Sequence, residues 1–507
     1  MKDKTIVLIS PRVLGAKGQI RKAPPPFGIA SLAATLNNKG YEKVHLIDAV
    51  VEDYDDMHEV KDNKTFITYG LSDQKMTTKV KNLKPDFIGI SALFSSQTEC
   101  AFSIAQSLKE TIPKIPIAMG GNHATECRTQ VMSDEKCIDF ILAGEADNTF
   151  PEFIDKYFKG ENYLEVAGLL YRDNGEIREN PFPKQLIDLD SLPFPAWHLY
   201  DMKKYYDIGM PHNPFLKYRE YGQIITSRGC PYKCYFCSVP DFNGSAFRFF
   251  SAERIISDVD QWVKDYGIKE LQILDDTFTT DWKRVVKIMK GIKKHKLRIS
   301  LPNAIRGDYP KDIDKRRLML NAMAEAGVYQ IDISVEHGDQ DFLDKVIGKS
   351  LDLETIPTTC DLAHEAGMTV HANFMMGFPY ENKQNRQKTI DYAHNLDSDS
   401  FSVSLCIPLP GTRMANIVDQ NDLFVDEYDV SRMTLDQVNI QPSDISPEEL
   451  KNTVENLNRE LNEKALMKRP QTLEKYLRFE RQGKSSGGDR KFHFRHSDTA
   501  SINIENS

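Results

Sequence analysis

Residues 222–240 read GQIITSRGCPYKCYFCSVP, and this stretch decides how the rest of the chain is interpreted. Its three cysteines, Cys230, Cys234 and Cys237, fall within eight residues of a 507-residue chain that has only eight cysteines in all. The apolar run before them predicts a short strand, so the cysteines are expected on the loop beyond the carboxyl end of that strand.

The spacing of these cysteines suits an iron–sulfur cluster better than zinc. Structural zinc takes four ligands, usually in two separated pairs, and no second pair follows at the usual distance. Three thiolates in one tight loop can instead hold a four-iron, four-sulfur [4Fe-4S] cluster and leave one iron open. That iron can be chelated by the amino and carboxylate groups of S-adenosylmethionine, whose reductive cleavage releases a 5′-deoxyadenosyl radical.

Alternating strands and helices continue downstream of the cysteine loop. A helix is predicted to begin at Ser251 and a later one to end at Gly327. Six strands are predicted, at 222–227, 270–278, 298–308, 329–339, 369–381 and 400–412. This alternation predicts a partial parallel barrel that is open on one side, with its active site at the carboxyl ends of the strands.

The N-terminal third has the same alternation. Five strands are predicted, at 5–10, 43–48, 86–92, 115–121 and 138–145, which indicates a doubly wound parallel sheet. Ligands of such sheets bind beyond the carboxyl ends of the strands. Ordinary turns also favour Gly and Ser, but four such loops at one edge predict a cofactor site formed by Pro25, Pro26, Ser91, Ser95, Gly120, Gly121, Asn122, His123, Gly144 and Glu145.

Specific segments resemble a known family. PPPFGIASLAATLNNKGYEKVHLID, GISALFSS, GGNHAT and FILAGEAD resemble the cobalamin-binding domain that precedes many radical S-adenosylmethionine enzymes. The cysteine motif, with Phe236 just before the third cysteine, resembles the radical S-adenosylmethionine signature. The Asp-x-His-x-x-Gly motif of many other cobalamin proteins is absent. His123 follows the fourth strand instead, where it is expected either to contact the corrin edge or to complete the turn.

The resemblance also implies roles for polar residues at the barrel mouth. Asp275 and Asp276 lie where the family approaches the methionine amino group, and Ser334 and Glu336 where it meets the ribose or methionine moiety. No catalytic residue is assigned. The full set expected at S-adenosylmethionine is Phe236, Asp275, Asp276, Asn303, Arg306, Ser334, Glu336 and Gly377, with Phe378 beside Gly377 near adenine.

The function implied by the resemblance is methylation of an unactivated carbon in a small molecule or natural product, through a 5′-deoxyadenosyl radical and methylcobalamin. Flavodoxin or ferredoxin is the expected electron donor. One alternative is an oxidative cyclase or rearrangement enzyme. Another alternative is a radical enzyme without cobalamin. It includes a methylthiotransferase-like enzyme, whose extra cluster would be held by Cys100, Cys127 and Cys137. We interpret these three cysteines instead as buried small hydrophobic residues. The last alternative is a non-enzymatic iron–sulfur or zinc protein.

Composition and charge limit the classes of protein to which this chain can belong. The chain is 40% hydrophobic and 27% charged, with a net charge of −9, which argues against a broad grip on nucleic acid. No apolar run reaches the length of a membrane span and no signal peptide is recognised, so a cytoplasmic protein with reduced thiols is expected. The predicted divisions are a cobalamin-binding domain (1–150), a linker with a hairpin at Asn174-Gly175 (151–220), a radical barrel (221–415), a helical region (416–480) and a disordered tail (481–507).

Overall fold

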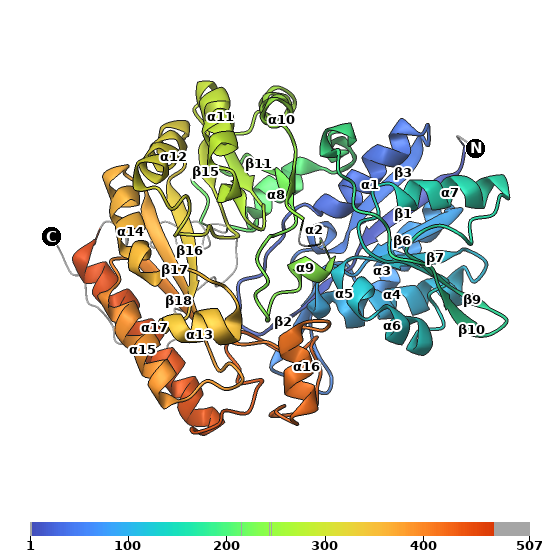
Figure 1. Cartoon of the computed structure of the whole chain (residues 1–507). Helices are drawn as coiled ribbons and strands as arrows, with labels where there is room; N and C mark the ends of the chain where they lie inside the picture. The colour runs from blue at the N-terminus through green and yellow to red at the C-terminus, as the bar shows by residue number, and fades with distance from the viewer. Residues whose placement is uncertain (1–2, 214, 243, 245, 471–507) are drawn as a thin grey trace.

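The computed structural model describes residues 3–213, 215–242, 244 and 246–470. The predicted disordered tail at 481–507 lies outside the described residues. Two α/β units stand side by side, and the last long helix lies on the outer side of the second unit (Figure 1). Among the described helices, none has the length and apolarity needed to cross a membrane.

The first unit contains the predicted doubly wound sheet. Its parallel strands lie in the spatial order β3-β1-β6-β7-β8. Side chains of β1 alternate between two cores: Ile6 and Leu8 pack with one helix layer, whereas Val7 and Ile9 pack with the other. Both faces of the sheet are therefore covered. The elements are β1 (Thr5–Ser10), β3 (Lys43–Asp48), β6 (Phe87–Ser91), β7 (Ile117–Gly120) and β8 (Phe140–Leu142), with α1 (Phe27–Asn38) and α7 (Thr149–Lys159) on one face and α3 (Asp73–Leu83) and α4 (Thr98–Thr111) on the other.

The predicted hairpin forms, and it extends this sheet. Strands β9 (Leu169–Asp173) and β10 (Glu176–Glu179) turn at Asn174 and Gly175, which have φ values of 50° and 88°. Two left-handed residues are what a type I′ turn requires. Strand β9 pairs antiparallel with β8. We therefore propose that the first unit continues through β10, beyond the boundary expected at residue 150.

A small antiparallel sheet was not predicted from the sequence. It consists of β2 (Val13–Ala16), β5 (Phe66–Tyr69) and β4 (Met57–Glu59). The sequence signal is weak because these strands have three or four residues and β4 is exposed along its whole length. This sheet flanks the loop that leads into α1.

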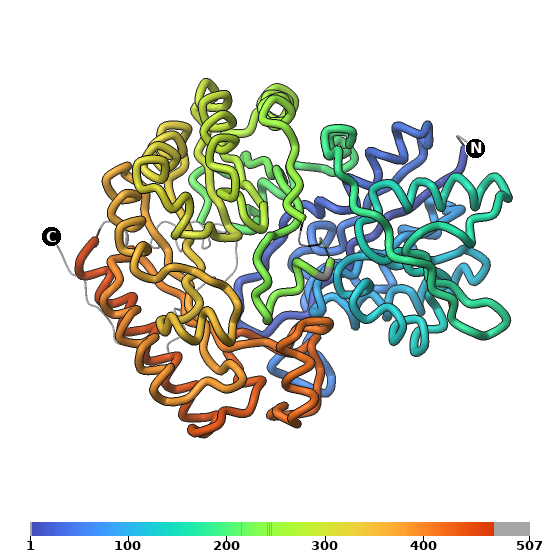
Figure 2. The backbone as a smooth tube through the Cα atoms, in the orientation of Figure 1, coloured from blue at the N-terminus to red at the C-terminus, as the bar shows by residue number. Residues whose placement is uncertain are grey.

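The second unit is the predicted partial barrel of six parallel strands. They form two three-stranded arcs, β11-β14-β15 and β16-β17-β18, joined by bridges from Ile299 to Val328 and from Ile305 to Ile333. Figure 2 shows the backbone of these arcs curving around a common interior. The strands are β11 (Tyr221–Ile224), β14 (Glu270–Ile273), β15 (Arg298–Ser300), β16 (Gln330–Glu336), β17 (Thr369–Met376) and β18 (Ser400–Leu405).

Helices cover the outside of the barrel. Helix α10 begins after Ser251, whose Oγ accepts a hydrogen bond from the Arg254 backbone, as the sequence predicts. Helix α12 ends at Gly327, which has a φ of 112°. The covering helices are α10 (Ala252–Tyr266), α11 (Trp282–Ile292), α12 (Ile313–Ala326), α14 (Ile356–Glu365) and α15 (Lys383–Asn395).

The interior face of β16, β17 and β18 is polar. Alternate residues such as Ile333, Ala372 and Val403 are buried in the core that includes the covering helices. The other alternate positions remain only partly buried, and they include Asp332, Ser334, His371, Asn373, Ser402 and Ser404. Barrel interiors of this kind are usually filled by branched apolar side chains. The interior here is instead suited to a polar ligand.

Helix α17 (Pro447–Lys468) closes the open edge of β18. Asn458 accepts a hydrogen bond from the Val403 backbone N–H (2.7 Å) and donates one to its carbonyl (2.7 Å). Asn462 makes the same pair of bonds to Phe401, at 2.9 and 3.0 Å. Two side-chain amides thus satisfy backbone groups that a seventh strand would otherwise pair. Helix α17 therefore covers the side of the barrel that the six strands leave open.

We expect Asn458→Leu to destabilise the protein by about 1–3 kcal/mol, because it leaves the backbone N–H and carbonyl of Val403 on the edge of β18 without hydrogen-bond partners. The measurement is the urea midpoint of unfolding. Asn452→Leu, at an exposed position of the same helix, is the matched control and should leave the midpoint unchanged. Equal midpoints for the two variants would show that the amide is not needed at this edge.

Candidate active site

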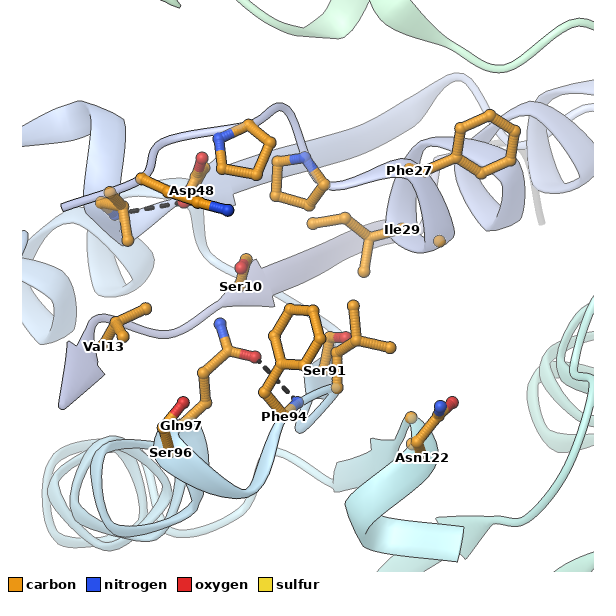
Figure 3. Close-up of a pocket in the computed structure, with 18 of the residues that line it drawn as sticks. Ser10, Val13, Phe27, Ile29, Asp48, Ser91, Phe94, Ser96, Gln97 and Asn122 are labelled. Carbon is orange, nitrogen blue, oxygen red and sulfur yellow. Dashed lines mark hydrogen bonds between the residues drawn. The ribbon is translucent and has the colours of Figure 1, made fainter. Parts of the chain in front are cut away.

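One cavity of about 770 Å³ lies between the carboxyl edge of the first sheet and the mouth of the barrel. Ser10, Ser91 and Asn122 reach it from the sheet edge (Figure 3). From the barrel it is lined by Ile225, Ser227, Arg228, Leu274, Asp276 and Asn303. The cavity therefore connects the two sites that the sequence predicts separately.

A C-terminal segment covers another side of the cavity. Ser431, Met433, Thr434 and Leu435 line it. Arg432 holds this segment against the first unit through Glu99, at 3.0 Å. The cavity wall is thus built from three separate parts of the chain.

Eight of the ten residues predicted at the cobalamin edge line this cavity: Pro25, Pro26, Ser91, Gly120, Gly121, Asn122, Gly144 and Glu145. Ser95 and His123 do not line it. The Ser95 hydroxyl and Nδ1 of the buried His123 are 3.1 Å apart, so the two side chains bind each other. Of the two expectations for His123, completion of the turn matches this geometry, and contact with a cavity ligand does not.

Buried ion pairs connect the two units at this edge. Arg228 donates to Asp147 at 2.6 and 3.2 Å and approaches Glu145 at 3.4 Å. Arg248 donates to both carboxylate oxygens of Glu145, at 2.8 Å to Oε2, the oxygen that Arg228 also approaches. The four side chains are between 4% and 11% exposed. Burial alone would raise the pKa of Asp147, but the charge and hydrogen bonds of Arg228, with a hydrogen bond from Ser31, hold that pKa below its usual range.

The cysteine loop is fixed by contacts from several elements. The backbone N–H of Tyr235 donates to Ile347, and its carbonyl accepts from Met414, both at 2.9 Å. The Arg306 guanidinium lies 3.9 Å from the centre of the Tyr232 ring. Phe236 packs on Phe378, with ring centres 5.9 Å apart. Arg306 therefore supports the loop and does not line the cavity.

The pKa of each of the three cysteines is raised overall, to about 12 for Cys237, and nearby cations oppose part of this shift at two of them. Burial raises the pKa of Cys230, Cys234 and Cys237, whereas the positive charges of Lys349 and Arg306 lower the pKa of Cys230 and Cys234. A thiol must lose its proton to ligate a metal, so these cations act in the required direction. Sequence reasoning missed Lys349, which pairs with Glu336 at 2.9 Å.

The Sγ atoms of Cys230, Cys234 and Cys237 do not all lie within 4.8 Å of one another. Within the described part of the chain, the one set of three possible metal-ligating atoms lying within 4.8 Å of one another is Asp361, His364 and Asp397. The three cysteine Sγ atoms are therefore spread more widely than the edge of about 3.8 Å in a tetrahedral zinc–thiolate site. Asp397 is itself engaged, since it binds Arg469 at 2.8 Å.

Of the residues predicted at S-adenosylmethionine, Asp276 and Asn303 line the cavity. Asp276 also faces the cysteine loop, because its negative charge raises the pKa of both Cys230 and Cys237. Asn303 donates its amide N–H to the Leu274 carbonyl at 2.7 Å. Asp276 thus lies both at the wall of the cavity and close to the cysteine loop.

The expectation that Asp275 faces the ligand is not met. Its carboxylate accepts hydrogen bonds from the Thr226 backbone, the Thr226 hydroxyl and the Ser227 hydroxyl, each at 2.5 Å. It is 2% exposed. Neighbouring residues after a strand point in opposite directions, and Asp275 points into the protein, where it fixes the segment that leads to Cys230.

The remaining predicted residues lie near the cysteine loop or in the barrel interior and do not line the cavity. Glu336 ends β16 with a φ of 68°. The Gly377 N–H donates to Glu381 at 2.7 Å, and Glu381 also binds the buried His337 at 3.2 Å. Ser334 lies on the polar interior face. Sequence reasoning missed Glu381 and His337, which carry no motif.

Cys100 and Cys137 of the first unit are buried, and Cys127 packs against the apolar core of the sheet. Burial raises the pKa of Cys100 to about 12 and that of Cys127 and Cys137 to about 11. Cys137 lies in the apolar core of the sheet. The interpretation as small hydrophobic residues is supported by this burial.

We expect Arg228→Met to destabilise the protein by about 3–5 kcal/mol, because it leaves Asp147 buried and unpaired. The urea midpoint measures this effect. Adding Asp147→Leu should recover part of the loss, since no unpaired charge then remains. The exposed Arg178→Met (52% exposed) is the control, with an expected effect of about 0–1 kcal/mol. A loss no larger than that of the control would contradict the assigned role.

Comparisons with known proteins agree with this geometry. Residues 224–393 match the radical SAM superfamily and residues 15–154 match the B12 binding domain. An uncharacterized methyltransferase of Pyrococcus horikoshii is 30% identical over 424 residues, which cover 83% of this chain and 84% of the relative. Cytidylyl-2-hydroxyethylphosphonate methyltransferase of Streptomyces wedmorensis is 28% identical, with 90% of each chain covered.

Two solved structures share the fold. The cobalamin-dependent S-adenosylmethionine radical enzyme OxsB has a TM-score of 0.62 at 21% identity; the match covers 83% of this chain but only 55% of that one. The radical S-adenosylmethionine methyltransferase TsrM from Kitasatospora setae has a TM-score of 0.64 at 15% identity, with 82% and 75% covered. Taken with the two domain matches and the relative from Pyrococcus horikoshii, they place this chain in the family of radical S-adenosylmethionine enzymes that carry an N-terminal cobalamin-binding domain.

Proposed function

We propose that this protein is a methyltransferase that adds a methyl group to an unactivated carbon of a small molecule. The observation that carries the proposal is the shared cavity, which reaches the carboxyl edge of the first sheet and, at Asp276, the surroundings of the cysteine loop. Two reactive groups can meet one substrate only if their sites open into the same space. The family membership supports this reading.

The residues present fit the expected cofactors. Cys230, Cys234 and Cys237 would hold the [4Fe-4S] cluster, Asp276 and Asn303 would contact S-adenosylmethionine, and the glycine- and proline-rich sheet edge would hold cobalamin. When bound, these groups supply a 5′-deoxyadenosyl radical and a transferable methyl group. The protein positions the substrate between them.

The cavity wall can also exclude water and stray hydrogen donors. Ile20, Leu93, Phe94 and Leu435 all line the cavity, and each is at least 40% exposed. Large apolar side chains exposed around a cavity shield a reactive intermediate from solvent. This property suits radical chemistry.

The names of the relatives do not fix the substrate. They include a hopanoid C-3 methylase of Methylococcus capsulatus and a 2-(S-pantetheinyl)-carbapenam-3-carboxylate methyltransferase. A second candidate function, oxidative cyclisation, is favoured by two relatives named anaerobic magnesium-protoporphyrin IX monomethyl ester cyclase, each 24% identical. Formation of S-adenosylhomocysteine together with 5′-deoxyadenosine separates methyl transfer from cyclisation.

We further propose that reduced flavodoxin or ferredoxin supplies the electron, in a cytoplasmic setting that keeps the thiols reduced. The three cysteines are only partly buried, which supports electron entry at this loop. The test is an assay of S-adenosylmethionine cleavage in which reduced flavodoxin or reduced ferredoxin replaces the chemical reductant. If neither protein donor yielded 5′-deoxyadenosine, the proposal would be contradicted.

We expect Cys230→Ala, Cys234→Ala and Cys237→Ala each to abolish formation of 5′-deoxyadenosine while corrinoid binding is retained. The reason is that two thiolates cannot hold a cluster with one open iron, whereas the sheet edge is untouched. Iron and sulfide content, chromatography of the products and the corrin absorption spectrum are the measurements. Cys127→Ala is the control and should behave like the wild type. Wild-type protein that bound no corrinoid would refute the proposed function itself.

Substitutions of the adjacent glycines Gly120 and Gly121 test the proposed position of cobalamin at the sheet edge. A Cβ built on Gly120 meets only the Leu142 carbonyl, at 3.4 Å, so Gly120→Val extends into open cavity. We expect normal folding and a corrinoid affinity about 5- to 150-fold lower, from overpacking of about 1–3 kcal/mol. The affinity is measured by equilibrium dialysis with cobalamin.

Gly121→Ala should have the opposite profile. Gly121 has a φ of 106°, and a Cβ there would lie 2.6 Å from the Ala92 carbonyl oxygen. The expected loss of stability is about 1–3 kcal/mol. Unchanged cobalamin affinity in Gly120→Val would show that the corrinoid does not lie against this strand end.

A further inference from the structure

Two basic side chains line the cavity on the side of the barrel interior. Lys22 belongs to the loop between β2 and α1, and His212 belongs to the segment before β11. The two segments are bonded to each other, since the Ala23 N–H donates to the Met210 carbonyl at 2.6 Å. The loop is also fixed to the first barrel strand, because Gln223 donates to the Pro25 carbonyl at 2.5 Å. Both basic groups are therefore held in place.

Within the described ranges, no hydrogen bond or ion pair is formed by the Lys22 ammonium or by the His212 ring. The neighbouring Arg21 is different: it donates to the Tyr54 carbonyl at 2.6 Å and lies over the Tyr54 ring at 4.3 Å. Lys22 is exposed and His212 half-buried, and both line the cavity, so the donor positions of the ammonium and the imidazole are open to a cavity ligand.

Charge interactions place the pair beside the barrel interior. Burial lowers the pKa of Lys22, and the negative charge of Asp332 on β16 opposes this effect. Burial, and then the charge of Lys22, lower the pKa of His212 to about 4, so its imidazole is neutral at pH 7. Asp332 itself accepts a hydrogen bond from Gln330 at 2.7 Å. The pair thus offers one positive charge and one neutral imidazole to the space in front of the polar strands.

We propose that Lys22 and His212 bind an anionic group of the substrate: a phosphate, a phosphonate or a carboxylate. The inference rests on the proposed function and names the substrate class for that same site. The ammonium supplies charge-assisted hydrogen bonds, and the imidazole N–H supplies a neutral one. Asn373 and Ser404 lie on the polar interior face of the neighbouring strands β17 and β18.

The test uses the full chain, reconstituted anaerobically with its cluster, cobalamin and S-adenosylmethionine. Phenylphosphonate, inorganic phosphate, benzoate and the uncharged benzyl alcohol are titrated by calorimetry. We expect at least one anion to bind and benzyl alcohol not to bind. Lys22→Met should weaken that anion by about 10- to 100-fold, His212→Ala should weaken it less, and Lys22→Arg should restore most of the affinity. The preferred anion distinguishes a phosphorus oxyanion from a carboxylate.

Lys17→Met is the matched control. Lys17 lies five residues earlier in the same loop region, pairs with Glu59 at the surface and is 60% exposed. It should leave all titrations unchanged. Equal weakening by Lys17→Met and Lys22→Met would mean a general effect of charge and would overturn the proposal.

Other outcomes also overturn it. Failure of all three anions to bind the wild-type enzyme would do so, as would unchanged affinity in Lys22→Met. If Lys22→Met lowered the affinity for cobalamin or S-adenosylmethionine and not for the anions, the pair would serve a cofactor's own anionic group. If His212→Ala removed a nitrogen splitting from the cob(II)alamin paramagnetic resonance spectrum, the imidazole would be a cobalt ligand. None of these results depends on methyl transfer, so they are separable from failure of the proposed function.

Discussion

The buried contact between Arg228 and Asp147 fixes the relation between the two halves of the site. Arg228 lies two residues before Cys230, and Asp147 lies three residues after Gly144 at the sheet edge. At 2.6 Å this ion pair leaves little freedom in the separation of the cysteine loop and the cavity floor. Desolvation makes such pairs costly, and they are retained where every charge is satisfied. Here Ser31, Glu145 and Arg248 complete the set, so the position of the cavity between the units depends on this cluster.

Much of the fold was predictable because its strands are apolar runs of ordinary length. Strands β1 and β3 have the bounds that the sequence indicates, five of the six barrel strands lie within their predicted segments, and β11 begins one residue earlier, at Tyr221. The sheet β2-β5-β4 was missed because its strands are short and partly polar. The hairpin at Asn174-Gly175 was predicted from its turn, but its pairing with β8 is a long-range contact that local sequence does not encode.

The residues of the site also fall into two groups: those that a local sequence motif predicts and those that only long-range contacts bring together. Cysteines within eight residues carry their own spacing, so a local motif was sufficient to predict them. Asp275 and Asp276 could not be told apart, because the direction of each side chain depends on a register that one residue reverses. Lys22, His212 and the pair His337 and Lys349 come from three separate parts of the chain, and only folding brings them near the cysteine loop or the cavity.

The polar interior of β16, β17 and β18 allows substrate selectivity to change without change of the fold. Each of these strands presents one row of side chains to the covering helices and the other row to open space. Replacements at Asn373 or Ser404 leave the apolar row intact, so they carry little folding cost. Selectivity can therefore drift by single mutations while the scaffold stays the same, which is how one architecture comes to serve chemically unrelated substrates.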